Sequence, residues 1–65
     1  GPVEQGRSWR VSEPGTNLTD LPGRGEVVVR LGPGTRVVEV DRQEGYILVT
    51  GPDGRTGWVD RRSVF

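Results

Sequence analysis

The sequence predicts an all-β domain of five short strands curled into a small barrel. Its apolar side chains are mostly β-branched, with eleven valines in 65 residues, and such side chains favour pleated strands over helices. Alanine, methionine and lysine are absent, and eleven glycines and five prolines interrupt the chain, so a helix longer than one turn has little room to form. Closure into a barrel lets so short a sheet shield its own inner face.

The folded domain is expected to occupy residues 9–65. Gly1–Ser8 mixes glycine, charge and a single valine without a period, which is typical of a flexible tag or linker, and the opening Gly1-Pro2 suggests the remnant of a protease site. The first strand is expected within Trp9–Ser12, because the turn residues Glu13-Pro14-Gly15 follow it.

A long loop is expected after this first strand, over Thr16–Gly25. Its apolar residues are only Leu18 and Leu21, and they are followed by Pro22-Gly23. This pattern indicates a loop pinned by two leucines rather than a strand or a helix.

The other four strands are recognised by alternating apolar residues between turn residues. They are expected at Glu26–Leu31, Thr35–Asp41, Tyr46–Thr50 and Arg55–Val59. In the first of these, one face carries Val27, Val29 and Leu31, and the other carries Glu26, Val28 and Arg30. In the second, Val38 and Val40 share a face, and Val37 breaks the alternation, which indicates a β-bulge.

The chain after Thr50 carries the clearest turn signal. Gly51-Pro52-Asp53-Gly54 predicts a tight hairpin with a glycine at positive φ. Asp60–Ser63 is too polar and too short for a strand and is expected to form a short 3-10 turn near the C-terminus. The last apolar pair, Val64-Phe65, is expected to add to a sheet edge.

Charge and composition argue against several classes of function. Nine arginines balance nine acidic residues, whereas a nucleic-acid-binding domain normally carries a basic excess, so we expect no nucleic-acid partner. No apolar run approaches the roughly 20 residues that span a bilayer, and no signal peptide is visible, so no membrane insertion is expected.

Catalysis and metal binding are not expected either. Histidine, cysteine and lysine are absent, and no carboxylate stands in an apolar context that would raise its pKa toward neutrality. The glycine-rich segments Gly23-Arg24-Gly25 and Gly32-Pro33-Gly34 lack the following helix whose amides would bind a phosphate. We therefore expect no enzyme activity, no cofactor, no disulfide and no metal site.

Four segments carry a resemblance to a known family. They are Asn17-Leu18-Thr19, Leu31-Gly32-Pro33-Gly34-Thr35, Gly45-Tyr46-Ile47-Leu48-Val49 and Asp53-Gly54-Arg55-Thr56-Gly57-Trp58-Val59. In this order they resemble the Asn-Val-Arg, Leu-x-x-Gly-Thr, aromatic-strand and Gly-Trp-Val segments of the bacterial SH3 (SH3b) family, from Trp9 to Phe65. The last is the most specific of the four. The resemblance implies a five-stranded SH3-like barrel.

The chain departs from the family pattern at three positions. Thr19 stands where arginine is usual, Tyr46 where tryptophan is usual and Ser63 where tyrosine is frequent. The Ala-Leu-Tyr-Asp-Tyr motif of eukaryotic SH3 domains is also absent, and the chain has a single tyrosine. A groove for proline-rich peptides is therefore not expected.

Candidate binding residues come from the aromatic strands. If Val59 faces the core, Trp58 faces outward, where it either lines a pocket or covers the barrel surface. Tyr46 and Leu48 share one face of their strand, and form a small apolar patch if the opposite face is core. This patch either contacts a partner or packs against loops.

Three acidic residues complete the candidate site. The resemblance implies that Asp20, Glu44 and Asp60 lie in loops that gather near Tyr46, where they would attract a basic peptide. The alternative is that they are solvated turn residues.

The expected function is that of a non-catalytic binding module of a larger bacterial protein. Its partner is expected to be a protein, a peptide or the cell wall, including the peptidoglycan stem peptide, and the isolated domain is expected to be a monomer. The alternative is a structural or regulatory spacer that packs on its own parent protein. A nucleic-acid-binding SH3-like domain fits the zero net charge least. The compartment, cell envelope or cytoplasm, depends on the parent protein.

Overall fold

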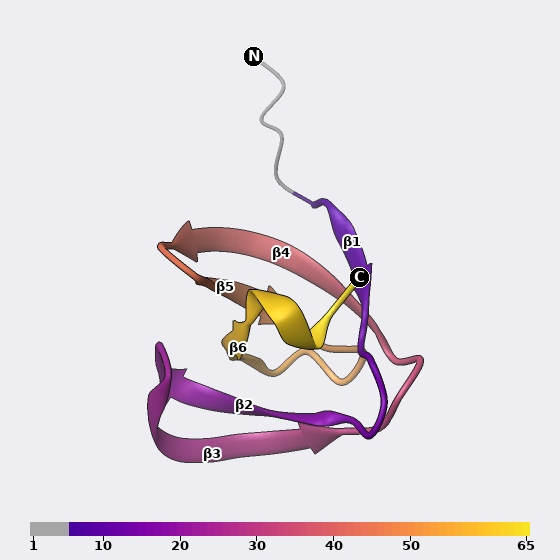
Figure 1. Ribbon diagram of the computed structural model, residues 1–65, viewed down its shortest axis with the longest axis horizontal. Coiled ribbons are helices and arrows are strands. Elements are labelled where there is room, and N and C mark those ends of the chain that lie inside the picture. The colour runs from indigo at the N-terminus through magenta and orange to yellow at the C-terminus, as the bar shows by residue number, and fades with distance from the viewer. Residues whose placement is uncertain (1–5) are drawn as a thin grey trace.

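The computed structural model describes residues 6–65 as one six-stranded antiparallel sheet followed by a single 3-10 turn. The elements are β1 (Ser8–Arg10), β2 (Thr16–Leu21), β3 (Arg24–Leu31), β4 (Arg36–Gln43), β5 (Tyr46–Thr50), β6 (Thr56–Asp60) and the 3-10 turn η1 (Arg61–Ser63). Across the sheet the order is β1-β4-β5-β6-β2-β3, and Figure 1 shows β4 and β5 above β2 and β3. The predicted all-β fold and the 3-10 turn near the C-terminus are confirmed.

The predicted long loop over Thr16–Gly25 is wrong, and the structure has six strands where five were expected. This segment forms β2 and the beginning of β3, which pair antiparallel around the turn Pro22-Gly23. Gly23 has φ +75°, as the third residue of a type II turn requires. The strand resembles a loop in sequence because only Leu18, which is fully buried, faces the core from an otherwise polar segment.

A β-bulge in β3 changes which valines face the core. Leu18 pairs with Val29 and Thr19 pairs with Val27, so Val28 is an extra residue on β3. Val27 is consequently 54% exposed and does not share the buried face of the strand, contrary to the predicted alternation.

The bulge in β4 lies three residues beyond its predicted position. Val37 is fully buried in the core and in regular pairing with Trp9, so it is not the bulged residue. The irregularity lies at Val40, because Glu39 pairs with Val49 and the next paired residue is Asp41. The position of a bulge depends on how a strand pairs with the adjacent strand. The alternation of side chains within one strand does not contain this information.

The predicted hairpin at Gly51-Pro52-Asp53-Gly54 is confirmed. Gly54 has φ +87° and donates its N–H to the Gly51 carbonyl at 3.0 Å. The two strands are in register, with Ile47 opposite Val59, and both side chains are buried.

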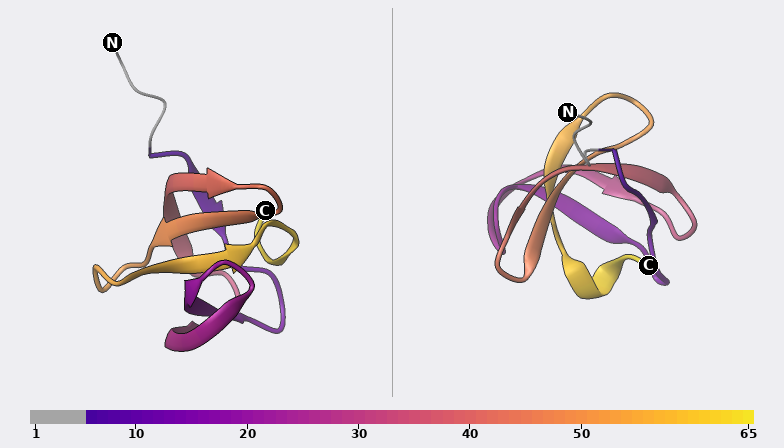
Figure 2. Two further views of the ribbon diagram at one scale, coloured as in Figure 1. Left: turned by 90° about the vertical axis from the view of Figure 1, so that its left-hand side faces the viewer. Right: turned by 90° about the horizontal axis from the view of Figure 1, so that it is seen from above.

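The sheet curls on itself (Figure 2), and one apolar cluster forms the core of the domain. Its buried members are Trp9, Val11, Leu18, Leu31, Val37, Ile47, Val49, Val59 and Val64. The C-terminal segment belongs to this core, because Val64 forms a β-bridge with Val11. Arg10 and Phe65 exchange two backbone hydrogen bonds of 2.8 Å, so the last apolar pair does add to an edge of the sheet, as expected.

The predicted lead-in Gly1–Ser8 falls partly outside the described residues, which begin at Gly6. Within the described part, Gly6 donates its N–H to the Glu39 carbonyl at 3.1 Å, and Glu39 donates its own to the Arg7 carbonyl at 2.8 Å. The backbone pairing between the N-terminal segment and β4 therefore extends to Gly6.

Trp9 fixes β1 to its surroundings through its ring and its indole N–H. The guanidinium carbons of Arg7 and Arg61 lie 4.9 and 4.4 Å from the ring centroid, and the indole donates a 2.9 Å hydrogen bond to Glu39. Arg42 donates two further hydrogen bonds to the Glu39 carboxylate, and these hydrogen bonds lower the pKa of Glu39 against the opposing effect of partial burial. This group, which we call the Trp9 cluster, ties β1, β4 and η1 together.

Candidate binding pocket

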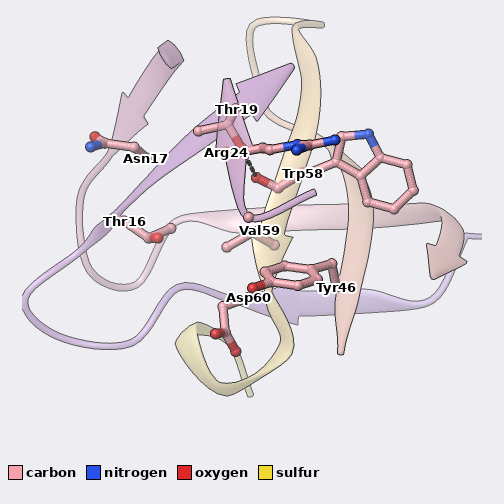
Figure 3. A pocket seen from close by; sticks show the side chains of 9 residues that line it. Thr16, Asn17, Thr19, Arg24, Tyr46, Trp58, Val59 and Asp60 are labelled. Carbon is pink, nitrogen blue, oxygen red and sulfur yellow. Dashed lines mark hydrogen bonds between the residues drawn. The ribbon is translucent and has the colours of Figure 1, made fainter. Parts of the chain in front are cut away.

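A shallow pocket of about 280 Å³ lies between the β2–β3 hairpin and the strands β5 and β6 (Figure 3). Its lining residues come from four strands and one turn, and are Thr16, Asn17, Thr19, Gly23, Arg24, Tyr46, Trp58, Val59 and Asp60. None of the residues of the Trp9 cluster lines it, so the two tryptophans occupy different sites.

The register of β5 and β6 sets the floor of this pocket. Tyr46 pairs with Asp60 and Leu48 pairs with Trp58, and all four side chains are partly exposed. The intervening residues, such as Val59, face the core, because successive side chains of a strand point to opposite faces. The strand alternation thus presents two aromatic rings and one carboxylate on the same outer surface.

Close approach of β2 to β6 forms the second wall. A Cβ atom at Gly57 would lie 2.6 Å from Leu18 Cβ and 3.1 Å from the Thr19 carbonyl oxygen, so only glycine allows this crossing. The Thr19 hydroxyl donates a 2.7 Å hydrogen bond to the Leu21 carbonyl. It also lies 3.4 Å from the carbonyl oxygen of Trp58. These contacts hold the hairpin against the aromatic strand.

The tip of the β2–β3 hairpin lies on Tyr46. A Cβ atom at Gly23 would lie 2.6 Å from the phenolic oxygen, so the turn packs directly against the ring. Arg24 follows immediately, and Figure 3 shows its side chain running toward Trp58 along the upper side of the pocket, with Tyr46 and Asp60 below.

Asp60 has a structural role at the lower side of the pocket. It is the N-cap of η1, and its Oδ1 accepts the Arg62 backbone N–H at 2.8 Å. The Arg62 guanidinium also donates to both carboxylate oxygens, at 3.3 and 3.1 Å. These hydrogen bonds from Arg62 lower the pKa of Asp60, so the carboxylate stays ionised at neutral pH with its negative charge compensated.

The structure brings together three of the six residues proposed from the sequence, namely Tyr46, Trp58 and Asp60. Leu48 is half-buried opposite Trp58 but does not line the pocket. Asp20 accepts the Glu26 backbone N–H at 3.0 Å within the hairpin, and Glu44 occupies the β4–β5 turn at φ +54°. Neither acidic residue lines the pocket.

Five lining residues were missed because their segment was interpreted as a loop. They are Thr16, Asn17, Thr19, Gly23 and Arg24. The available signal was Pro22-Gly23 in the two central positions of a turn, which predicts a hairpin when the flanking residues can pair. The flanking residues are mostly polar, and this composition indicates a loop. The turn residues and the composition of the flanks therefore gave opposite predictions.

Two further features concern metal binding and membrane-spanning helices. Within residues 6–65, no group of three or more acidic side chains is close enough together to hold a metal ion. Over the same part of the chain, no helix has the length and the apolar character needed to cross a membrane.

Comparison of the chain with models of protein families, with curated proteins and with solved structures found no match.

Proposed function

We propose that this chain is a non-catalytic binding module that recognises a peptide, protein or cell-wall partner at the pocket between the β2–β3 hairpin and β6. The observation that carries the proposal is the partial exposure of Tyr46 and Trp58 side by side in that pocket, where a partner would cover both rings. In this proposal the curled sheet is an SH3-like barrel of the bacterial SH3 type, belonging to a larger bacterial protein.

The chemistry of the pocket supports a binding role rather than a catalytic one. Its one lining carboxylate, Asp60, has a lowered pKa, whereas a general acid or base at neutral pH needs a raised one. The carboxylate is also engaged by the side chain and backbone of Arg62.

Titration of the domain with soluble peptidoglycan fragments and with peptides from candidate partner proteins tests this function. The two indole N–H signals give an internal comparison, because Trp58 lines the pocket and Trp9 belongs to a separate cluster. We expect saturable shifts at Trp58 and Tyr46 with little change at Trp9.

Trp58→Ala is expected to weaken this binding at least about tenfold, as for an aromatic anchor of an interface. Phe65→Ala is the matched control, because Phe65 is a 70% exposed aromatic residue that does not line the pocket. Equal weakening by both variants, or shifts confined to residues outside the pocket, would refute the assignment of the binding site.

A second candidate function is a structural domain that packs on its parent protein. The observation that favours it is the exposure of two apolar side chains on the β2–β3 hairpin, Leu21 at 47% and Val27 at 54%. Saturable shifts at these two residues on adding the rest of the parent protein, together with no response to fragments or peptides, would support this function over the first.

A further inference from the structure

We propose that the group bound in the pocket is a carboxylate, that of a peptide C-terminus, and that Arg24 binds it. This inference rests on the proposed function and names the ligand chemistry of the same pocket. It reverses the charge preference expected from the sequence, in which acidic side chains attract a basic peptide.

The first observation is that Arg24 differs from most other arginines of the domain. Seven arginines have side-chain partners within residues 6–65. Arg10, Arg30, Arg42, Arg55 and Arg62 donate hydrogen bonds, and Arg7 and Arg61 stack on Trp9. In the same part of the chain, the side chains of Arg24 and Arg36 have no hydrogen bond, ion pair or aromatic contact, and Arg24 alone of these two lines the pocket.

The second observation concerns the hydrogen-bonding groups that a ligand would meet. Arg62 occupies three of the roughly four acceptor positions of the Asp60 carboxylate, and the Thr19 hydroxyl donates to a backbone carbonyl. Within residues 6–65, the Arg24 guanidinium and the hydroxyls of Thr16 and Tyr46 have no hydrogen-bond partner; the guanidinium only donates, and the two hydroxyls can donate or accept. A pocket whose unused groups are mainly donors favours a ligand group that only accepts, as an ionised carboxylate does.

The net charge of the pocket leads to the same ligand class. Its charged lining residues are Arg24 and Asp60, and the charge of Asp60 is compensated by Arg62. The remaining positive charge is that of Arg24. Because guanidinium and carboxylate match in planar geometry, this pairing gives orientation as well as attraction.

The size and apolar part of the pocket restrict the ligand further. The volume of about 280 Å³ is slightly below the range of typical small-molecule sites, which suits one terminal residue rather than a long segment. Tyr46 and Trp58 then offer apolar surface to the side chain of that residue. The proposed ligand is therefore a C-terminal residue with an apolar side chain, its carboxylate at Arg24.

Three acetylated tripeptides test the proposal. Gly-Ala-Leu with a free C-terminal carboxylate, the same peptide with a C-terminal amide, and amidated Gly-Asp-Leu are titrated at millimolar concentration, following backbone and indole N–H shifts. We expect the free acid to bind at least about tenfold more tightly than its amide, because hydrogen bonds between ionised groups are the stronger class. Stronger binding of the amidated aspartyl peptide than of the free acid would overturn the assignment to a C-terminus.

Two variants locate the effect. Arg24→Gln should reduce binding of the free acid to the level of the amide, whereas Arg36→Gln, which removes the same charge from an exposed arginine outside the pocket, should leave it unchanged. Equal losses in both variants would indicate a general electrostatic effect and overturn the role of Arg24.

The remaining outcomes separate this inference from the proposed function. Pocket shifts of equal size with the acid and the amide overturn the carboxylate assignment and leave a binding pocket. Silence toward all three peptides also overturns it, while the titration with peptidoglycan fragments still decides the function. If the free-acid peptide shifts signals elsewhere in the domain but not those of Tyr46 and Trp58, the result contradicts both the carboxylate assignment and the proposed binding site.

Discussion

At the scale of single residues, Glu39 links the stability of the domain to pH. Its carboxylate accepts hydrogen bonds from Arg42 and Trp9, and its pKa is held below the ordinary value of 4.5, mainly by the hydrogen bonds from Arg42. The folded state therefore binds this proton less readily than the unfolded state. The resulting stability is fully present above about pH 4.5 and is lost as the pH falls through the lowered value.

Glu39→Gln is therefore expected to destabilise the domain by about 1 kcal/mol at neutral pH, the usual contribution of such hydrogen bonds. The difference from the wild type should shrink as the pH falls below 4.5. Urea unfolding at a series of pH values measures it, and Glu13→Gln, at an exposed acidic residue with no side-chain partner among residues 6–65, serves as the control. A difference that stays constant with pH would contradict the linkage.

Gly57 is expected to be among the least replaceable residues. Its hypothetical Cβ meets Leu18 Cβ and a backbone oxygen, neither of which can move without shifting β2. Gly57→Ala should cost about 3 kcal/mol, at the upper end for overpacking, out of the roughly 3–10 kcal/mol expected for a domain of this length. Gly32→Ala, where a Cβ would meet nothing within 4 Å, should have little effect on thermal unfolding. Similar melting temperatures for the two variants would show that β2 adjusts to the extra methyl group.

At the scale of elements, the position of the β2–β3 hairpin determines the shape of the pocket. Gly23→Ala introduces both the strain of a side chain at φ +75° and a contact with the Tyr46 hydroxyl. Gly34→Ala introduces the same kind of strain, at φ +86°, with nothing within 4 Å of the added Cβ. We expect the backbone strain to cost about 1 kcal/mol in each variant, and the contact with Tyr46 to add to that cost in Gly23→Ala alone.

Amide and aromatic shifts distinguish these two variants. Only Gly23→Ala should move the signals of Tyr46 and Trp58, because only this substitution displaces the hairpin from the ring beneath it. Undisturbed aromatic signals in Gly23→Ala would mean that the turn does not rest on Tyr46.

The sequence was informative about elements whose apolar residues alternate and whose turns have strict backbone requirements. The β5–β6 hairpin was predicted in place, because Gly51–Gly54 permits few other conformations. Its register, and the burial of Ile47 and Val49 on the inner face, come from the structure. The outward orientation of Tyr46 and Trp58 was predicted only on the condition that the opposite faces of their strands are core. The structure meets that condition, because Ile47, Val49 and Val59 are buried.

Sequence reasoning failed where long-range packing decides the local structure. β2 carries one inward leucine and is held as a strand by its pairing with β3 and β6, which sequence-local patterns do not contain. Since this strand and the turn at Gly23 supply most of one pocket wall, half of the site remained hidden. Arg24 looked like an ordinary loop residue for the same reason.

At the scale of the whole molecule, the single core predicts a single cooperative unfolding transition. Trp9, near the N-terminal edge, belongs to the same buried cluster as Leu18 and Val59, whose strands support the pocket around Trp58. The chain has no cysteine, so no disulfide can hold one part folded while another opens. The bridge between Val11 and Val64 further connects the two ends of the described chain.

Urea titrations followed by circular dichroism and by the separate indole N–H signals of Trp9 and Trp58 should therefore give the same midpoint. Val64→Ala, which removes buried apolar surface at the bridge to Val11, should lower that midpoint for both indoles together, at a cost of about 2 kcal/mol. If β1 and the C-terminal segment were only an accessory layer, Val64→Ala would shift the Trp9 transition to lower urea and leave that of Trp58 in place. The binding pocket would then belong to a core smaller than the one described.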